Sequence, residues 1–204
     1  MALRALSAMI MFAVVTGCTS TTQDRQLDVA DTSQATILMT VGEGWAFQSG
    51  QAYVELSSEE SSVNLRSMTD RRGGPGSADF IESRNRAFEY NAVSVPPGTY
   101  SLTNWGFTMR AGEATPRRIG AVAFKPGETY YLGTFFANNL TQTSRVRDGW
   151  QSERQAYLDK YPELADEKIQ NVAGSFLVKC WKMDVTDRLV GDVDIMKQAT
   201  QGCR

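Results

Sequence analysis

The sequence predicts a mainly β fold, a β-sandwich that carries two or three short helices near its C-terminal end. Two observations indicate this fold class. A strand–turn–strand pattern occurs twice between residues 93 and 132, and shorter stretches of apolar and β-branched residues precede it. After residue 139 the spacing of apolar residues changes from that of a strand to that of a helix. The helices are therefore expected to follow the strands in the chain.

Three segments before the repeat are candidate strands. Residues 35–41 are apolar or β-branched and end at Gly42-Glu43-Gly44. Residues 52–56 alternate weakly and are a candidate partner of the first strand, and residues 61–68 form the third candidate. The glycine-rich residues 69–77 lack the spacing and the strand–loop–helix context of a phosphate-binding loop, which favours a solvated loop.

The near-repeat contains the sharpest structural signals in the chain. Its two turns are Pro96-Pro97-Gly98 and Lys125-Pro126-Gly127-Glu128, each between strand-like segments. Proline at the second turn position and glycine at the third are typical of a type II turn, in which the glycine takes a positive φ. We therefore expect Gly98 and Gly127 both to adopt the left-handed conformation.

A helical segment is expected over about residues 148–173. Asp148 is a candidate cap with Gln151 three residues later, and a helical stripe follows, made of Trp150, Tyr157, Leu158 and Tyr161. Pro162 ends this helix. A second short helix is predicted over residues 164–172, stopped by Gly174, and a strand over residues 175–181. We expect the helices to cover one sheet face or one end of the sandwich, and residues 187–198 to form a short amphipathic tail.

The repeat also carries a resemblance. The pattern Val-x-Val-Pro-Pro-Gly-Thr-Tyr-x-Leu and the later Phe-Lys-Pro-Gly-Glu-Thr-Tyr-Tyr-Leu-Gly resemble small bacterial lipoproteins with a transthyretin-like β-sandwich, a fold also found in carboxypeptidase regulatory domains. The similarity covers about residues 37–138. It implies a transthyretin- or immunoglobulin-like sandwich and supplies no catalytic residues, because the shared motif is a turn.

The N-terminal residues have the parts of a secretory signal. Arg4 precedes an apolar stretch over residues 5–15, and two small residues then lead to Cys18. The ending Val15-Thr16-Gly17-Cys18 resembles a bacterial lipobox, which implies cleavage before Cys18 and lipid on its thiol. An ordinary signal with a coincidental cysteine is the alternative. With a lipobox, residues 1–17 are the signal peptide, 18–33 a polar tether and 34–204 a single domain.

The anchor predicts a location and a partner. Two or three acyl chains hold a protein on a bilayer far more firmly than one. Thr19 follows the cysteine in place of the aspartate that would favour inner-membrane retention, so the resemblance points to the outer membrane of a Gram-negative cell, with the domain facing the periplasm. Cys180 and Cys203 then remain as a pair in an oxidising compartment and are expected to form a disulfide, two free thiols being the alternative.

Composition excludes several function classes. Removal of Arg4 with the signal leaves 20 basic against 23 acidic residues, a formal charge of −3, which provides no basic excess for nucleic-acid binding. The chain has no histidine, which excludes Ser-His-Asp and Cys-His catalysis and every histidine-ligated metal site. We expect no metal and no other cofactor.

No catalytic residue is predicted. The carboxylates at Glu59-Glu60, Asp166-Glu167 and Asp192/Asp194 do not match a calcium loop, and no Ser-x-x-Lys signature is present, so these groups are interpreted as solvated charges and the protein as a non-enzyme.

Aromatic residues are the candidates for binding. Trp45 and Trp105 are the candidate surface residues, because four tryptophans exceed what a core of this size needs. Trp105 has the strand parity opposite to Tyr100 and Leu102, so it points outward if those two point inward. The alternative is that a helix covers it. The sequence thus favours a non-catalytic binding or structural module of the envelope, the contrasting hypothesis being a factor or enzyme directed at peptidoglycan or another glycan.

Overall fold

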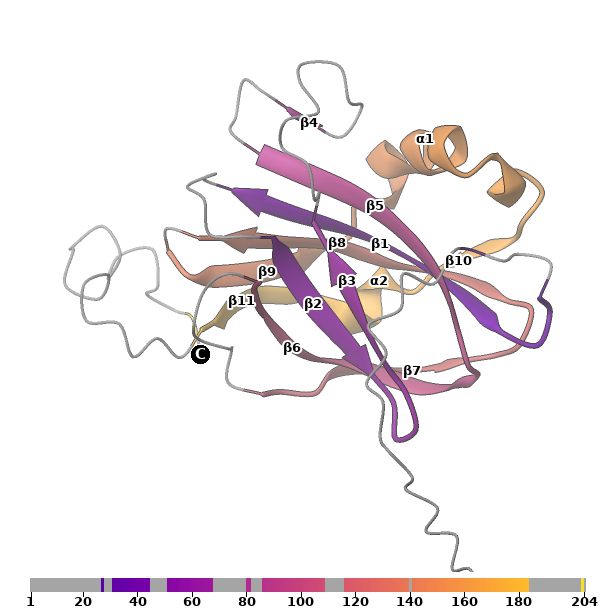
Figure 1. Cartoon of the computed structure of the whole chain (residues 1–204), viewed down its shortest axis with the longest axis horizontal. Helices are drawn as coiled ribbons and strands as arrows, with labels where there is room; N and C mark the ends of the chain where they lie inside the picture. Colours follow the sequence, from indigo (N-terminus) through magenta and orange to yellow (C-terminus); the bar gives the residue numbers. More distant parts are fainter. Residues whose placement is uncertain are drawn as a thin grey trace, which may run out of the picture.

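The computed structural model describes residues 31–44, 51–67, 80–81, 86–108, 116–139 and 141–183, together with Leu27 and Cys203. The described chain is mostly β-strand, arranged in two sheets, with short helices in its C-terminal part (Figure 1). The mainly β class with C-terminal helices is therefore confirmed. Cys18 and Trp45, the solvated loop expected over residues 69–77, and the tail expected over residues 187–198 lie outside the described residues.

The larger sheet has seven strands. Six follow the order β11 (Val178–Lys182), β9 (Thr143–Arg147), β8 (Thr129–Asn138), β1 (Ala35–Gly44), β5 (Arg86–Val95) and β4 (Phe80–Ile81), and β10 (Ile169–Asn171) also pairs with β8. β1 runs parallel to β8 and antiparallel to β5. All ten residues of β1 are buried, because this central strand is covered on both faces.

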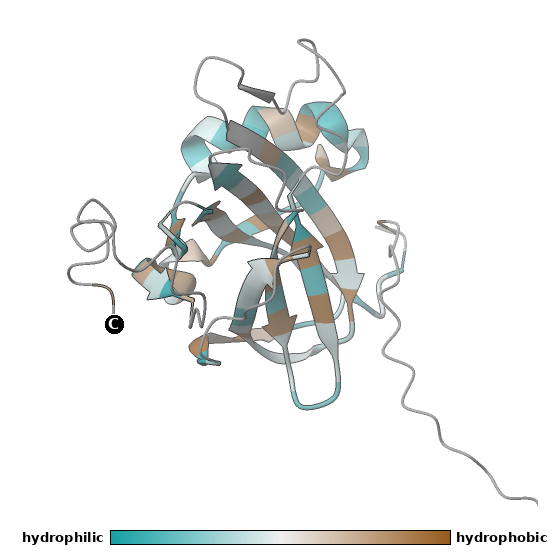
Figure 2. Cartoon of the chain, turned by 60° about the vertical axis from the view of Figure 1, so that its left-hand side comes forward, coloured by the Kyte–Doolittle hydropathy of each residue, from teal (hydrophilic) through white to brown (hydrophobic). Residues whose placement is uncertain are grey.

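The smaller sheet has four strands, in the order β3 (Ser62–Arg66), β2 (Ala52–Ser57), β6 (Gly98–Phe107) and β7 (Ile119–Phe124). The expectation that residues 52–56 pair with the first strand is wrong, because β2 pairs with β3 and β6 instead. In β2 the residues Ala52, Val54 and Leu56 are buried while the residues between them are half-buried, which is the alternation of a strand with one face on the core. Figure 2 shows the same alternation of hydrophobic and hydrophilic residues along the strands.

One apolar core joins the inner faces of the two sheets. It contains Ile37 and Met39 of β1 together with Val54 of β2 and Leu102 of β6. A second, smaller cluster lies on the outer face of the larger sheet, where Leu38 of β1 packs with residues of the C-terminal helix. The larger sheet therefore lies between two apolar layers, whereas the smaller sheet contributes to one.

The two predicted turns connect the sheets and differ in conformation. The chain passes from β5 to β6 through the first turn and from β7 to β8 through the second, so each turn moves it from one sheet to the other. Gly127 has φ +71°, and the Glu128 N–H donates to the Lys125 carbonyl at 3.3 Å, as a type II turn requires. The same prediction for Gly98 is wrong, because Gly98 begins β6 and has no positive φ.

The helical segment follows the predicted start but not the predicted middle. α1 (Trp150–Lys160) begins after Gly149 and ends before Pro162. The predicted cap at Asp148 is wrong by one residue, because Gly149 is the N-cap and no side chain caps the helix, although the Trp150 N–H donates to the Asp148 carboxylate at 3.0 Å. The second helix expected over residues 164–172 is wrong: a 3₁₀ turn η2 (Pro162–Leu164) and strand β10 occupy this segment.

The other short helix begins later than expected. α2 (Ala173–Phe176) contains Gly174, which was predicted to stop a helix, and the final strand β11 consequently starts at Val178 rather than at residue 175. α1 packs on the outer face of the larger sheet, through Tyr157 in the second apolar cluster (Figures 1 and 2), as expected.

Candidate functional site

A buried carboxylate lies between α1 and the larger sheet. Glu153, in the first turn of α1, is only 6% exposed. Its Oε2 accepts hydrogen bonds from the hydroxyls of Thr40, at 2.6 Å, and Tyr131, at 2.8 Å. Its Oε1 accepts a third from the Thr134 hydroxyl at 2.5 Å. The Tyr157 hydroxyl lies 3.1 Å from that of Thr40, so four hydroxyl groups and one carboxylate form a single network, called here the Glu153 network.

A bulge in β8 brings these donors to one face. Leu38 of β1 pairs with Tyr131, but Thr40, two residues on, pairs with Thr134, so β8 contains one residue more than β1. Gly133 in this step has φ +113°, a conformation that favours glycine. Without the extra residue, Tyr131 and Thr134 would point to opposite faces, because they are three positions apart.

Gly149 allows the helix to approach this closely. A Cβ at this position would lie 2.4 Å from both Glu153 Oε1 and Thr134 Oγ1. Its N–H also donates to the Tyr131 hydroxyl at 3.2 Å, which gives the tyrosine a donor as well as an acceptor. The network therefore requires a glycine immediately before α1.

Electrostatics keep the tyrosines of the network neutral. Burial, together with the nearby charge of Glu153, raises the pKa of Tyr131 and Tyr157 well above the ordinary value of tyrosine. Both side chains thus remain hydroxyl donors at neutral pH. Both oxygens of the Glu153 carboxylate already accept hydrogen bonds from the protein, and the carboxylate is buried between α1 and the sheet. The Glu153 network therefore joins the helix to the sheet and presents no atom to a substrate.

A second buried carboxylate ties the two sheets together at the end of β1. Glu43 Oε2 accepts from the Ala52 N–H at 2.8 Å and from the Ser67 hydroxyl at 2.9 Å. Ala52 begins β2 and Ser67 follows β3, so this one side chain of the larger sheet reaches two strands of the smaller. Its role, like that of Glu153, is to hold elements in place.

Trp105 does not lie on the surface, and the prediction that it points outward is wrong. Its side chain is fully buried in the core between the sheets, edge-to-face against Phe135 with ring centroids 5.9 Å apart. The alternative, a helix covering it, is also wrong, because the opposite sheet does so. A bulge is the reason: Leu56 pairs with Leu102 while Glu55 pairs with Asn104, so one extra residue reverses the parity of β6.

The outer face of the smaller sheet supplies a different aromatic residue, which sequence reasoning missed. Tyr53 of β2 points away from the core and its ring lies against Gly106 of β6, where a Cβ would be 2.8 Å from the Tyr53 hydroxyl. The face around it is built of exposed or half-buried residues: Glu55, Ser57, Asn64, Arg66, Thr99, Thr103 and Asn104. Two features of the sequence could have revealed Tyr53 as a surface residue: the alternation in β2 and the glycine in β6.

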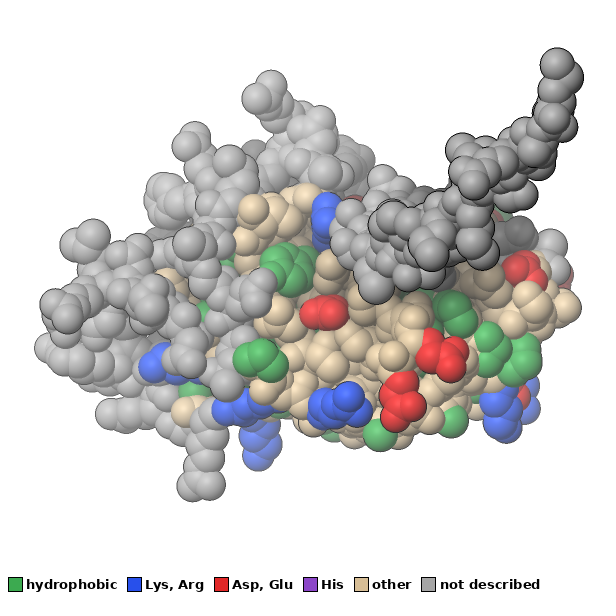
Figure 3. Space-filling model, turned by 60° about the horizontal axis from the view of Figure 1, so that its bottom comes forward, with side chains coloured by type: hydrophobic (Ala, Val, Ile, Leu, Met, Phe, Trp, Pro, Cys, Tyr) green, Lys and Arg blue, Asp and Glu red, His purple; other side chains and the backbone are tan. Residues whose placement is uncertain are grey.

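This outer face, called here the Tyr53 face, is mostly uncharged. The hydroxyls of Ser57 and Thr103 lie 2.9 Å apart across β2 and β6, and Ser57 donates to Glu55 at 2.9 Å. Figure 3 looks from the side where β6 and β7 lie in Figure 1, and there backbone and uncharged side chains predominate over scattered charges. A polar sheet face with an aromatic ring suits ligands with many hydroxyl or amide groups.

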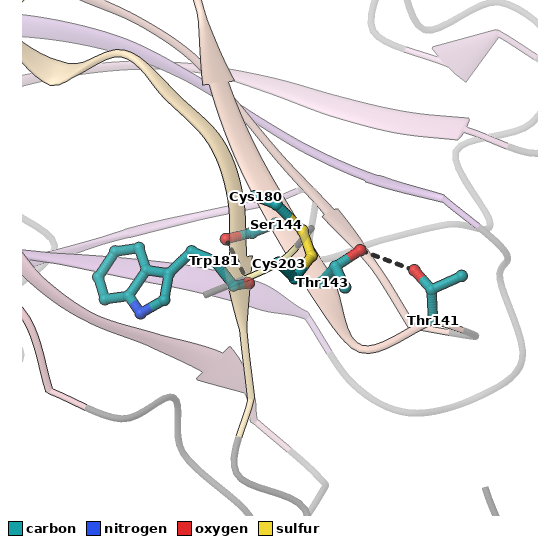
Figure 4. The surroundings of a disulfide bond; sticks show 6 residues. All are labelled: Thr141, Thr143, Ser144, Cys180, Trp181 and Cys203. Atoms are coloured by element: carbon teal, nitrogen blue, oxygen red, sulfur yellow. Dashed lines mark hydrogen bonds between the residues drawn. A yellow bond between two sulfur atoms is a disulfide. The ribbon is translucent and has the colours of Figure 1, made fainter. Parts of the chain in front are cut away.

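The expected disulfide is present in the structure. Cys180 of β11 is bonded to Cys203, with the Cα atoms 5.0 Å apart, a distance that a disulfide spans. Cys180 points away from Trp181, toward Thr143 of β9 (Figure 4). Trp181 is buried in the core, so the disulfide lies on the outer side of this edge strand.

The described members of the predicted solvated carboxylates lie apart from both networks. Glu59 and Glu60 are exposed in the β2–β3 turn, and before β10 Asp166 is exposed and Glu167 half-buried, whereas Asp192 and Asp194 lie outside the described residues. Among the residues that the structure describes, no group of three or more acidic or cysteine side chains is arranged to hold a metal ion. The same part of the chain contains no helix long and apolar enough to cross a membrane.

Comparisons with known proteins add little. No family model matches the chain, and no curated protein matches it. Part of the chain is similar to a leucine-rich repeat protein from Bacteroides thetaiotaomicron, with a TM-score of 0.31 and 10% identity. The alignment covers 62% of this chain and only 16% of that protein. A likeness of this kind carries no argument about fold or function.

Proposed function

We propose that the protein is a non-catalytic binding module of the bacterial envelope, attached to a membrane through lipid on Cys18 and using the Tyr53 face as its contact surface. The anchor rests on the lipobox-like sequence at residues 15–18 and on the polar residues that separate it from β1. In a Gram-negative cell this places the domain on the periplasmic side of the outer membrane.

The finer fold type is part of this proposal. We infer a transthyretin-like sandwich, supported by two sheets that share one core and by two Pro-Gly turns that each carry the chain between the sheets. Such a domain has two outer sheet faces, and in this protein the two faces differ. The proposed contact surface is chosen on the basis of this difference.

The observation that carries the proposal is the contrast between the outer faces. On the larger sheet, α1 packs over Leu38 and Tyr131 and is fixed by the Glu153 network. On the smaller sheet, Tyr53 and its polar neighbours are exposed or half-buried. The first face is covered by α1 over β1 and β8, so the second sheet face is proposed as the contact surface for a partner.

The anchor is tested by Cys18→Ala. The proposal expects loss of lipid labelling and release of the protein from the outer-membrane fraction, because the thiol is the only attachment point for the diacylglycerol. A control variant, Cys203→Ser, keeps Cys18 and should still be labelled. Persistent labelling of Cys18→Ala would contradict the anchor.

The contact surface is tested by capture experiments with the tagged chain in detergent. Tyr53→Ala combined with Asn104→Ala alters the Tyr53 face, while Leu177→Ala removes a side chain that is 53% exposed before β11. We expect an envelope protein to be captured by the wild type and by Leu177→Ala but lost with the double variant. Equal capture by all three proteins would contradict this use of the face.

A glycan-directed factor is the second candidate, favoured by the Tyr53 ring on a sheet face rich in hydroxyl and amide groups. Sugars stack on aromatic rings and bind such groups by hydrogen bonds. Saturable binding to purified peptidoglycan, lost in the same double variant, with no protein captured, would replace the leading proposal with this one.

A further inference from the structure

The larger sheet also carries a concentrated positive charge beside α1. Four basic residues lie on the neighbouring strands β9 and β11 and are all exposed: Arg145, Arg147, Lys179 and Lys182. They are called here the basic strip. The whole chain has a formal net charge of −2, so the local positive charge of the strip is opposite in sign to the net charge of the protein.

Strand register places Arg145, Arg147 and Lys182 on the outer face, and Lys179 is exposed within the register shift between Val178 and Trp181. In β9 the buried Ser144 and Val146 alternate with the exposed arginines. Arg145 pairs with Phe136 and Arg147 with Thr134, both on the outer side of β8. In β11, Trp181 points into the core, and Lys182 follows it and pairs with Thr143.

Within the described residues, no carboxylate forms an ion pair with the strip. The ion pairs of this part of the chain are Lys125 with Glu128 and Lys160 with Glu89. Arg145 instead lies over the Phe136 ring, 5.4 Å from its centroid, which orients the guanidinium without neutralising it. Among the described residues, the charge of the strip is therefore not neutralised by a carboxylate.

Protection of a sheet edge against pairing with another chain explains the two lysines of the strip but not its two arginines. Lysines on an edge strand discourage pairing with another chain, and β11 is an edge strand. β9 lies between β11 and β8, however, so its two arginines protect no edge. Arginine presents a planar fork of donors that matches phosphate oxygens.

We infer that the basic strip binds the phosphate headgroups of an anionic bilayer and so sets the orientation of the domain. The inference rests on the proposed lipid anchor, which holds the domain at the surface through about 16 tether residues, a chain with a root-mean-square reach of ~20 Å. With the outer face of the larger sheet toward the bilayer, the Tyr53 face, on the opposite sheet, points away from it. A lipid chain and a basic patch together are a known way to combine weak membrane signals.

The test uses the processed chain, residues 18–204, with Cys18→Ser so that no lipid contributes; it retains every described residue. Co-sedimentation is measured with phosphatidylcholine vesicles and with vesicles that also contain phosphatidylglycerol. We expect binding to the anionic vesicles alone, weakened by raising the salt from 0.05 to about 0.5 M, because surface attraction is screened.

A charge-matched pair of variants makes the test specific. One variant carries Arg145→Gln, Arg147→Gln, Lys179→Gln and Lys182→Gln. The control carries Arg117→Gln, Arg118→Gln, Lys125→Gln and Lys168→Gln, which removes the same charge from exposed or half-buried positions outside both α1 and the Tyr53 face. Unchanged far-UV circular dichroism shows that both are folded.

The strip variant should lose on the order of 10³-fold in partitioning, and the control much less. No binding by the unsubstituted chain, or equal binding by the two variants, would overturn the inference. Because Cys18 carries no lipid in this assay, its result is independent of the labelling experiment that tests the anchor.

Discussion

The Thr40 hydroxyl donates a 2.6 Å hydrogen bond to the Glu153 carboxylate across 113 positions of sequence. It joins the central strand of the larger sheet to the one long helix of the described chain. The link lies where the helix begins, and at the other end Lys160 pairs with Glu89 while the Tyr161 hydroxyl donates to the Tyr90 carbonyl. The Glu153 network therefore fixes the N-terminal end of α1 against the sheet.

Replacement of Glu153 should destabilise the fold without touching the Tyr53 face. Glu153→Leu leaves the hydroxyls of Thr40, Tyr131 and Thr134 without their acceptor, and we expect a loss of about 3 kcal/mol in the free energy of unfolding. Urea unfolding at pH 7 measures it. Glu163→Gln, at an exposed position in η2, should change stability by less than about 0.5 kcal/mol. Similar values for both variants would show that the network contributes little.

The two glycines near the short helices provide a matched comparison. Gly149→Ala places a methyl group 2.4 Å from two oxygens of the network and should destabilise by about 1–3 kcal/mol. Gly174→Ala in α2 meets nothing within 4 Å and should be neutral or stabilising by up to about 1 kcal/mol, because alanine favours a helix. Thermal unfolding of both variants tests the contrast, which would fail if the two shifted in the same direction.

Most of the strands are predictable from the sequence, because alternation and turn chemistry are local, but β4, β9 and β10 are not predicted. The sheet face toward which a side chain points is not predictable in the same way. Trp105 was placed on the wrong face because one unpaired residue reverses the parity of β6, and nothing in Thr103-Asn104 signals this in advance. The partner of β2 was also mispredicted, since the local pattern is the same whichever sheet receives the strand.

The helical region shows the same limit. Pro162 ended α1 as predicted, since proline acts locally. The spacing of apolar residues predicts a second helix that includes Ile169, but pairing with Thr129 places this residue in a strand. The Glu153 network was not foreseen, because neither its bulge nor its depth below α1 can be read from the spacing of Thr40, Tyr131 and Glu153.

The burial of Trp105 makes a quantitative prediction. Trp105→Ala should cost about 3–5 kcal/mol in the free energy of unfolding, because it opens a cavity beside Phe135 and Phe107. Thr99→Ala, at an exposed position of the same strand, should cost less than about 0.5 kcal/mol. Denaturant unfolding measures the loss of unfolding free energy in both variants. If Trp105 lay on the surface, the loss would be small for Trp105→Ala as well as for Thr99→Ala.

The disulfide should stabilise the domain against unfolding. It closes a loop of 23 positions, for which chain entropy gives about 3 kcal/mol. We expect Cys180→Ser combined with Cys203→Ser to lower the unfolding midpoint, and reductant to lower that of the wild type but not of the double variant. Peptide mapping without reductant should recover the linked peptides, and free thiols at both positions would contradict the pairing.

The two tyrosines of the Glu153 network predict how stability depends on alkaline pH. Their pKa values are raised in the folded protein, so the folded state holds its protons more tightly than the unfolded chain does. The stabilisation is complete below the unfolded value near 10 and falls as the pH rises above it, by up to about 1.4 kcal/mol per pH unit for each tyrosine.

Substitution of both tyrosines tests this dependence. Tyr131→Phe combined with Tyr157→Phe should be less stable than the wild type at pH 7, because Glu153 and Thr40 lose hydroxyl partners. Between pH 10 and 11.5, however, its stability should decline less steeply, since these two positions can no longer ionise on unfolding. Urea unfolding at several pH values gives both slopes. Parallel slopes for the two proteins would show that the tyrosines titrate alike in the folded and unfolded states.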